Sequence, residues 1–302
     1  MKEVTAVVVT YNRKLLLKQN IQSLLGKSGN EKLNIIIVDN ASTDGTYDEI
    51  KPYLQHENVI YRNTGKNIGG AGGFNYGIKI ALKTQCEYIW LMDDDTMPEP
   101  DALERLLEAD EQLKGNYGFL SSNVLWKDNS LCLMNMQAYY RKKIYPEKYK
   151  ENLIRVTQAT FVSILFKVDT VKKIGLPIKD FFIWCDDVEY TRRMSVVNKL
   201  PCYMVKASRV HHLMAKNTGS NIAIDVEERI SRYRYAYRNE FYTYRREGLA
   251  RLLYFCARCV YHMMRIMVCA KNSRWRRIIT LISGFAAGLI FYPDIEYIEN
   301  EK

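Results

Sequence analysis

The sequence predicts an α/β protein with a mainly parallel sheet flanked by helices. Short apolar runs of strand length alternate with segments of helical periodicity through about the first hundred residues, which is the pattern of βαβ units. The runs are almost continuously apolar, as in strands that are buried on both faces. Polar and charged residues follow each run directly. We therefore expect them to meet at the edge of the sheet where the carboxyl ends of the strands gather and ligands bind.

The expected elements follow one another in a regular order. Strands are predicted at residues 4–9, 33–38, 59–61 and 88–92, with helices at 13–25, 43–54 and 77–82 between them. An amphipathic helix is predicted over residues 99–113, where two prolines suit a helix start. Residues 117–168 are less regular, but 158–166 have the character of a further central strand.

The composition is that of an ordinary globular protein. The chain of 302 residues is 47% hydrophobic and 26% charged, which excludes an intrinsically disordered chain. Its seven cysteines form no regular framework, so we expect reduced, mostly buried thiols and no zinc site. No secretory hydrophobic segment precedes the first strand, and the catalytic part is therefore expected to stay in the cytoplasm.

The character of the chain changes near residue 220. We predict a catalytic domain over residues 1–220 and a helical region over 221–302, rich in Arg, Tyr and long apolar side chains. The arginines at 251, 258 and 265 recur every seven residues and would share one stripe of a helix, whereas the apolar segment 278–292 is too short to span a bilayer. A basic amphipathic helix predicts contact with an anionic membrane surface. Packing on the catalytic domain, or on a second subunit in a homo-oligomer, is the alternative.

Three consecutive carboxylates, Asp93, Asp94 and Asp95, directly follow the fourth predicted strand. Like charges so close together raise one another's pKa, so a fold keeps such a cluster where a cation neutralises it. Hard oxygen ligands suit Mg²⁺ or Mn²⁺, and these ions usually carry phosphates as well. The triplet predicts a metal–diphosphate site at the edge of the sheet. A solvated acidic turn is the alternative.

A glycine-rich segment over residues 67–77 follows the third predicted strand. It contains five glycines, and backbone N–H groups in such a loop ahead of a helix can bind an anion. The spacing does not match a Walker loop. We expect the loop to contact phosphate or sugar, the alternative being a tight loop that lets a helix pack on the sheet.

A second acidic cluster, Asp186 and Asp187, follows the aromatic run 181–184. One of two adjacent carboxylates can accept a proton from a hydroxyl while the other positions that hydroxyl, and Trp184 offers an apolar face for a sugar ring. The alternative is that these acids only begin a helix, where its dipole favours them. Farther along, His211 and His212 are adjacent, and one of them could complete the coordination begun by the aspartates.

These motifs together resemble a known family. TYNR after the first strand, VDNASTDGT after the second, NIGGAGG and then DDD resemble, in this order, the nucleotide-sugar-dependent glycosyltransferases of family 2, which have the GT-A fold. The resemblance covers about residues 4–215. The NIGGAGGF segment, the acidic segment that begins at Trp184 and the following histidine resemble bacterial galactofuranosyltransferases and related rhamnosyltransferases, as does the stretch RYRYAYRNEF over residues 232–241.

The resemblance implies a role for each of the matching positions. The nucleotide and its diphosphate would be bordered by Thr10, Asn12 and Arg13, with Asp39 holding the uracil or ribose. The donor sugar and phosphates would face Asn67, Gly70, Gly72 and Gly73. Asp93 and Asp95 would bind the divalent metal, Mn²⁺ or Mg²⁺, with His212 rather than His211 as third ligand and Asp94 near the ribose.

The resemblance also implies the acceptor side and the reaction. Asp187 would be the general base, and Asp186 and Trp184 would bind the acceptor. Cys185 departs from the pattern of close relatives, which place the tryptophan directly beside the acids, so the identity of the aromatic wall stays open. Attack by the acceptor hydroxyl on the side opposite the leaving diphosphate would invert the anomeric configuration.

The expected function is therefore an inverting, metal-dependent glycosyltransferase of bacterial cell-surface polysaccharide synthesis. UDP-galactofuranose is the expected donor and dTDP-rhamnose the alternative, with a glycan or polyprenyl-diphosphate-linked glycan as acceptor, at the inner face of the cell membrane. A nucleotidyltransferase is a more remote alternative, because residues 10–20 contain no glycine and so lack its loop signature. Only the net charge of +10 suggests a non-catalytic or nucleic-acid-binding protein. The acidic residues at the edge of the sheet argue against binding of nucleic acid at that edge.

Overall fold

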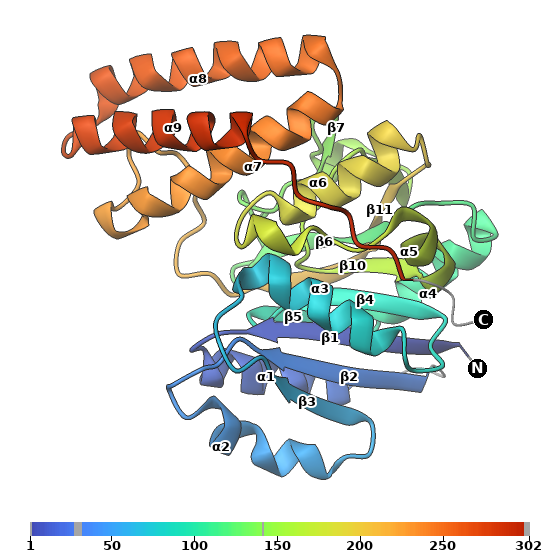
Figure 1. Ribbon diagram of the computed structural model, residues 1–302. Helices are drawn as coiled ribbons and strands as arrows, with labels where there is room; N and C mark the ends of the chain where they lie inside the picture. The colour runs from blue at the N-terminus through green and yellow to red at the C-terminus, as the bar shows by residue number, and fades with distance from the viewer. Residues whose placement is uncertain (1, 27–31, 141, 299–302) are drawn as a thin grey trace.

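A nine-stranded sheet runs through the part of the chain that the structure describes, residues 2–26, 32–140 and 142–298 (Figure 1). The outer ends of the two predicted regions, residues 1 and 299–302, lie outside that range. In this computed structural model the strands lie in the order β3-β2-β1-β4-β10-β6-β11-β5, and β9 pairs with β11 off this path. The predicted α/β architecture with a sheet between helices is confirmed.

The parallel half of the sheet aligns its strand ends. It consists of β1 (Glu3–Thr10), β2 (Lys32–Asp39), β3 (Val59–Asn63) and β4 (Tyr88–Asp93). Thr10 is level with Asp39, and Val9 with Asp93. Because parallel strands end at the same edge, the polar residues that follow them meet there as expected.

The other half of the sheet is mixed. β10 (Ile164–Lys167) runs antiparallel to both β4 and β6 (Leu120–Trp126), and β11 (Tyr203–His212) runs parallel to β6 but antiparallel to β5 (Thr96–Pro98) and β9 (Leu153–Arg155). A separate two-stranded sheet pairs β7 (Ala138–Tyr139) with β8 (Lys142–Lys143).

The predicted strand over residues 158–166 is wrong for most of its length. Only its end belongs to β10, and the preceding residues form turns in which Phe161 packs edge-on against Phe74 in the core. Ser163 meanwhile accepts a hydrogen bond from Trp90 Nε1 at 2.9 Å. The apolar run marked a buried segment, but burial alone does not distinguish a strand from an irregular segment.

Helices cover both faces of the sheet, as the continuous apolar strands predicted. On one face α1 (Lys14–Leu25) and α4 (Ala102–Leu113) pack against Ala6, Val8 and their neighbours. On the other face α3 (Gly69–Ala81), α5 (Val168–Ile174) and α6 (Asp186–Arg192) pack against Val7 and Val9. Alternate residues of each strand serve opposite faces. The helix predicted over 43–54 is divided into α2 (Thr46–Ile50) and the 3₁₀ turn η1 (Lys51–Gln55).

The glycine-rich segment is largely helical instead of a loop. The helix predicted over 77–82 begins eight residues earlier, at Gly69. A Cβ on Gly77 would lie 2.3 Å from Val7 Cγ1, and one on Gly73 would lie 2.6 Å from Val9 Cγ1. These glycines therefore let α3 lie close against β1, which is the alternative that the sequence left open.

Three long helices form the C-terminal region: α7 (Tyr233–Arg246), α8 (Leu249–Cys269) and α9 (Arg274–Leu289), preceded by η5 (Glu227–Arg232). Figure 1 shows them gathered beyond one side of the sheet, around a core of their own that includes Phe255 and Leu281. Residues 290–298 then return across the rest of the protein, where Leu176 N–H donates to Glu296 O at 2.8 Å. The boundary near residue 220 stays a prediction.

Three further short helical turns lie within the sheet-containing part of the chain. They are η2 (Pro146–Lys148) between β8 and β9, η3 (Lys179–Phe181) between α5 and α6, and the π-helical turn η4 (Arg193–Val197) that continues α6.

Candidate active site

The aspartate triplet lies where β4 ends near the centre of the sheet. Asp93 is the last residue of β4, and Asp94 and Asp95 form the turn into β5. Asp94 and Asp95 are each only 3% exposed. The triplet is therefore not a solvated acidic turn, and its charges must be balanced within the protein.

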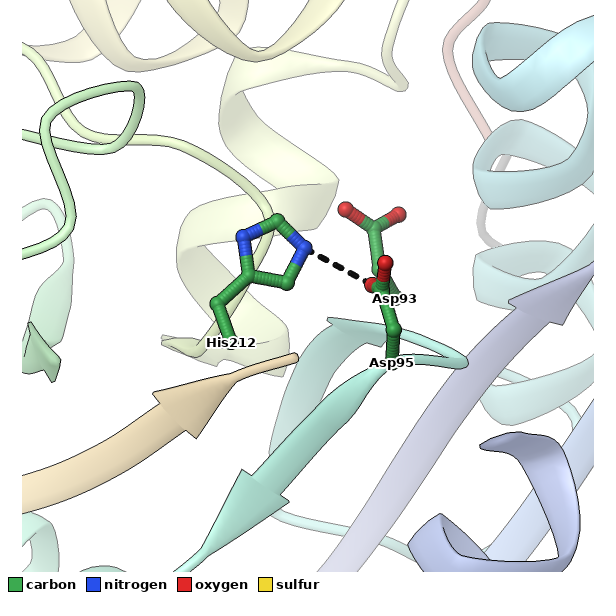
Figure 2. Close-up of side chains that lie close together, drawn as sticks. All are labelled: Asp93, Asp95 and His212. Carbon is green, nitrogen blue, oxygen red and sulfur yellow. Dashed lines mark hydrogen bonds and ion pairs between the residues drawn. The ribbon is translucent and has the colours of Figure 1, made fainter. Parts of the chain in front are cut away.

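His212 meets the triplet because β11 pairs with β5. Antiparallel pairing sets His212 opposite Thr96, and its Nε2 lies 2.7 Å from Asp95 Oδ1. Figure 2 shows the imidazole facing Asp95, with Asp93 beside it. His211 points to the opposite face of the strand, where its Nε2 lies 3.2 Å from Glu99. Of the two histidines, only His212 is placed among the aspartates.

Asp93, Asp95 and His212 form a group that fits a divalent cation. One ligand atom from each lies within 4.8 Å of the others. Two carboxylates and one imidazole are a donor set suited to Mn²⁺, and two carboxylates also suit Mg²⁺. The chemistry and spacing of the residues are thus compatible with the metal that the motifs predicted.

The electrostatics of this group are those of a buried ion-pair cluster. Burial and the neighbouring charge of Asp95 raise the pKa of Asp93 to about 7. Burial acts to lower the pKa of His212, but the hydrogen bond with Asp95 outweighs it and raises the pKa to about 10. Burial alone would raise the pKa of Asp95, but the hydrogen bond with His212 and the charges of His212 and Arg13 outweigh burial, so the pKa of Asp95 is lowered. These shifts favour a proton on His212 that pairs it with the Asp95 carboxylate in the absence of a cation, and binding of a divalent cation at Nε2 would release that proton.

Asn135 holds the other side of the His212 ring, and the sequence analysis missed it. Its Oδ1 lies 2.7 Å from His212 Nδ1 and accepts the Cys132 thiol at 3.0 Å, while its Nδ2 donates to Thr160 Oγ1 at 3.0 Å. With the amide in this orientation, His212 Nδ1 donates to Asn135 Oδ1, and Nε2 is the nitrogen that faces the carboxylates. Asn135 lies outside any regular element, and no sequence pattern marked it.

Two of the predicted nucleotide residues contact the triplet directly. Thr10 Oγ1 donates to Asp94 Oδ2 at 2.7 Å. Arg13 Nη1 lies 3.3 Å from Asp94 and 2.5 Å from Asp95. Burial raises the pKa of Asp94 to about 6, although Arg13 opposes that shift. The Arg13 guanidinium is half exposed, so it balances the triplet from the solvent side.

Asn12 and Asp39 lie at the carboxyl ends of the two neighbouring strands, Asn12 two residues after β1 and Asp39 as the last residue of β2. Asn12 has a positive φ of 54°, and its Oδ1 accepts the Thr43 N–H at 2.7 Å. The buried Asp39 carboxylate accepts Ser42 N–H at 2.8 Å and the Tyr61 hydroxyl at 2.7 Å. Burial and the Asp39 hydrogen bond raise the pKa of Tyr61 to about 12, so Tyr61 stays a donor. Tyr61, which the sequence placed only in a strand, thus joins this part of the site.

The predicted donor-loop residues differ in their surroundings. Asn67 is exposed and accepts the Gly69 N–H at 2.8 Å, just before α3 begins. A Cβ on Gly70 would meet nothing within 4 Å, whereas Gly72 and Gly73 lie against Ile68 and Val9. Gly70 is thus the glycine beside open space. Contact of Gly72 and Gly73 with the donor stays a prediction, because packing already accounts for their lack of a side chain.

The second acidic cluster lies close enough to the first to interact with it electrostatically. Asp186 and Asp187 begin α6, and the charge of Asp93 contributes to the raised pKa of Asp186, after burial and Asp187. Burial raises the pKa of Asp187 to about 6, and its Oδ1 accepts Val188 N–H at 2.7 Å. One carboxyl in this pair is therefore held as the neutral acid more strongly than the other, as a base beside a positioning group requires.

The aromatic residues around Asp186 turn toward the C-terminal helices. Trp184 packs edge-on against Tyr233 with ring centroids 4.8 Å apart, and the Arg229 guanidinium lies 5.6 Å from the Trp184 ring. Cys185, where the chain departs from the family pattern, has a positive φ of 65° and is partly buried. Trp184 is half-buried, and its contact with the acceptor stays a prediction.

Comparison with known proteins places these features in a family. The family model of glycosyl transferase family 2 matches residues 5–166, more than half of the chain. The chain is 26% identical over 266 residues to galactofuranosyltransferase GlfT1 of Mycolicibacterium smegmatis, covering 83% of this chain and 85% of that protein. It is 25% identical over 177 residues to poly-beta-1,6-N-acetyl-D-glucosamine synthase of Staphylococcus aureus strain COL, covering 58% and 42% of the two chains.

The fold has a counterpart among solved structures. The mannosyltransferase PcManGT from Pyrobaculum calidifontis, solved in complex with GDP-Man and Mn²⁺, superposes with a TM-score of 0.60 at 14% identity, covering 95% of this chain and 87% of that one. The resemblance drawn from the motifs is confirmed for family and fold. The chain therefore belongs to glycosyl transferase family 2, and it is a glycosyltransferase with the GT-A fold.

Proposed function

We propose that the protein is an inverting, metal-dependent transferase that moves galactofuranose from UDP-galactofuranose to a hydroxyl of a glycan or polyprenyl-diphosphate-linked glycan. The observation that carries this proposal is that two acidic clusters, Asp93–Asp95 with His212 and Asp186–Asp187, lie close enough to interact electrostatically. One cluster suits a cation that carries a diphosphate, and the other suits the removal of a proton from an acceptor.

On the donor side, positive groups converge where the diphosphate would lie. A divalent cation held by Asp93, Asp95 and His212 would neutralise charge that develops on the leaving diphosphate. The half-exposed Arg13 guanidinium is close enough to add a second positive charge. The amino-terminal end of α3, at Gly69, favours an anion through the helix dipole, although the Gly69 and Ala71 N–H groups already donate to Asn67 Oδ1 and Phe182 O.

On the acceptor side, Asp187 removes the proton of the attacking hydroxyl. Its pKa of about 6 leaves the carboxylate ionised at neutral pH yet basic enough to accept a proton. Asp186, whose pKa is raised well above its usual range, holds the hydroxyl through a hydrogen bond. Attack from the side opposite the diphosphate gives one inversion and requires no covalent intermediate.

Galactofuranose is supported by the likeness to GlfT1 over most of both chains. The test is a panel of donors, UDP-galactofuranose, UDP-galactopyranose, UDP-N-acetylglucosamine and dTDP-rhamnose, each with a lipid-linked glycan acceptor and product analysis by NMR. Transfer from UDP-galactofuranose with inverted anomeric configuration is expected. Selective transfer from dTDP-rhamnose, or release of pyrophosphate from a sugar phosphate and a nucleotide, would reject the assignment.

Metal dependence has its own test. Calorimetry with UDP is expected to show binding with Mn²⁺ and loss of that binding after EDTA treatment, because the diphosphate and the carboxylates would otherwise repel each other. The same protein with Asp95→Asn should bind Mn²⁺ weakly. Equal UDP binding with and without a divalent cation would contradict the metal role.

We also propose that the C-terminal helices rest on an anionic membrane surface at the cytoplasmic side. The stripe of arginines predicted for this contact faces the protein: Arg251 lies 3.8 Å from Glu247, and Arg258 pairs with Glu240. The outward stripe of α8 is apolar instead, with Leu253, Val260 and Met264 each more than half exposed. The membrane prediction therefore rests on different residues from those that suggested it.

The α8–α9 turn supplies the positive charge. Lys271, Arg274 and Arg276 are exposed there beside Trp275, which is 71% exposed. The outward side of α9 adds Ile279, 63% exposed. Apolar stripes beside lysine, arginine and tryptophan match an interfacial helix pair, because the apolar face enters the lipid boundary while the cations meet anionic headgroups. By length and composition α8 is also the one described helix that could cross a bilayer.

Vesicle sedimentation tests this surface. Replacement of the three cations at the turn by Gln should weaken binding to phosphatidylglycerol vesicles by about 10²-fold, since each contributes about 1 kcal/mol. A charge-matched control removes three exposed lysines elsewhere, Lys114, Lys172 and Lys173. Equal loss in both variants, or a concentration-dependent dimer that buries α8 without vesicles, would reject the lipid assignment.

A further inference from the structure

The segment that precedes Asp186 and Asp187 has a strained backbone. Phe182, Trp184 and Cys185 have φ values of 63°, 67° and 65°, in the left-handed region that bulky residues rarely adopt. Phe182, with ψ of −63°, is the centre of a three-residue turn in which Ile183 N–H donates to Phe181 O at 2.7 Å. Turns of this hand are rare and strained, and such conformations persist only where the surroundings hold them.

One side chain of α7 holds this segment. Asn239 is fully buried, and its Nδ2 lies 3.0, 3.2 and 2.8 Å from the carbonyl oxygens of Phe181, Ile183 and Trp184. Its Oδ1 accepts the Arg238 Nε–H at 2.9 Å. With the oxygen occupied by a cation donor, the amide nitrogen must face the three carbonyls.

The opposite side of the segment rests on α3. Ala71 N–H donates to Phe182 O at 3.2 Å, and a Cβ on Gly69 would lie 2.0 Å from that same oxygen. The segment is thus held between the beginning of α3, on the proposed donor side, and α7 of the C-terminal region. Any relaxation of the turn would shift the start of α6, where Asp186 and Asp187 lie.

We propose that Asn239 is a positioning residue for sugar transfer, which fixes the place of Asp187 by holding the strained turn before it. This inference rests on the proposed role of Asp187 as the base. It makes the C-terminal region a working part of the acceptor site, because the group that holds the turn comes from α7. A misplacement of about 1 Å at a reacting group can cost about 10²-fold in rate.

The test compares Asn239→Ala and Asn239→Asp with Tyr237→Phe. The aspartate has the shape of asparagine but loses the N–H donors that face the carbonyls. Tyr237→Phe also removes a partly buried hydrogen bond from α7, the one at 2.8 Å to His262 Nδ1, which faces α8 and not the turn. We expect kcat to fall about 10²-fold in both Asn239 variants, with the Kd for UDP and Mn²⁺ unchanged within about twofold and wild-type behaviour for Tyr237→Phe.

Amide hydrogen exchange gives a readout that does not depend on activity. Exchange over residues 181–187 should accelerate on the order of tenfold in the Asn239 variants, with β4 and α8 unchanged. Wild-type exchange and wild-type kcat would overturn the inference. If the wild-type protein transfers no sugar, the proposed function fails, while the exchange rates still decide whether Asn239 holds the turn. Should Asn239→Ala not fold, Arg238→Met is the milder variant, since it removes the donors to the carbonyls of Asp180 and Phe181.

Discussion

Replacement of Asp187 by asparagine should separate sugar transfer from donor binding. The two side chains have the same shape, and the asparagine oxygen can still accept the Val188 N–H that Asp187 binds at 2.7 Å. The substitution removes the ability to ionise and replaces one acceptor oxygen by an N–H₂ donor. We expect kcat to fall about 10²–10⁴-fold, the usual contribution of a general base, while calorimetry shows an unchanged Kd for UDP with Mn²⁺.

The pH dependence of the wild-type protein provides a second measurement. Because the base must be ionised and its pKa is raised to about 6, kcat/KM should rise with pH and level off above about 6. A plot of kcat/KM without an inflection in that region, together with wild-type turnover in Asp187→Asn, would refute the assignment of Asp187 as the base.

Asp187→Asn should also increase the free energy of unfolding at neutral pH. The folded pKa of Asp187 is raised from 3.8 to about 6, so the folded state prefers the proton, and stability is lost as pH rises from about 4 to about 6. Above that range the buried charge costs up to about 3 kcal/mol. Urea unfolding at pH 8 should therefore show Asp187→Asn as the more stable protein, with little difference at pH 3.5. Asp169→Asn, at an exposed acid in the first turn of α5, is the matched control and should gain nothing.

Three further predictions concern packing, the donor side and the metal group. Gly77→Ala should lower the free energy of unfolding by about 1–3 kcal/mol in urea titrations, because the new Cβ would lie 2.3 Å from Val7 Cγ1. A Cβ at position 70 meets open space, so Gly70→Ala should leave the free energy of unfolding unchanged or raise it slightly. A loss of affinity for the donor in this variant would indicate that Gly70 faces the ligand. Asn135→Ala should weaken Mn²⁺ binding about 10–100-fold in EPR titrations by freeing the ring of His212, and unchanged affinity would show that Asn135 does not orient it.

The sequence predicted those features that depend on local pattern. The strands from β1 to β4 have continuous apolar runs, and parallel pairing then brings Thr10, Asp39 and Asp93 to one edge. The residue pattern also marked Asp186, Asp187 and the two adjacent histidines, and the resemblance favoured His212 over His211. The pairing of β11 with β5 supplies the physical reason for that preference, because it places His212 and not His211 beside the triplet.

Other features depend on contacts between distant parts of the chain and leave no local signal. Asn135 and Asn239 are single amides in segments without a distinguishing pattern, and their importance comes from the ring and the carbonyls that they meet. The sequence shows that Arg251 and Arg258 share one side of a helix, but it does not show which way that side faces. The side faces the protein because Arg258 pairs with Glu240 of α7 and Arg251 lies near Glu247, the residue after α7.

The return of residues 290–298 across the body of the protein gives the C-terminal helices two attachments. The chain enters them through η5 and leaves them through a segment that is joined to α3 by the Lys79–Glu296 ion pair at 2.5 Å. Because the lobe is attached at both ends, movement about η5 alone would not separate α7 from the turn that precedes Asp186.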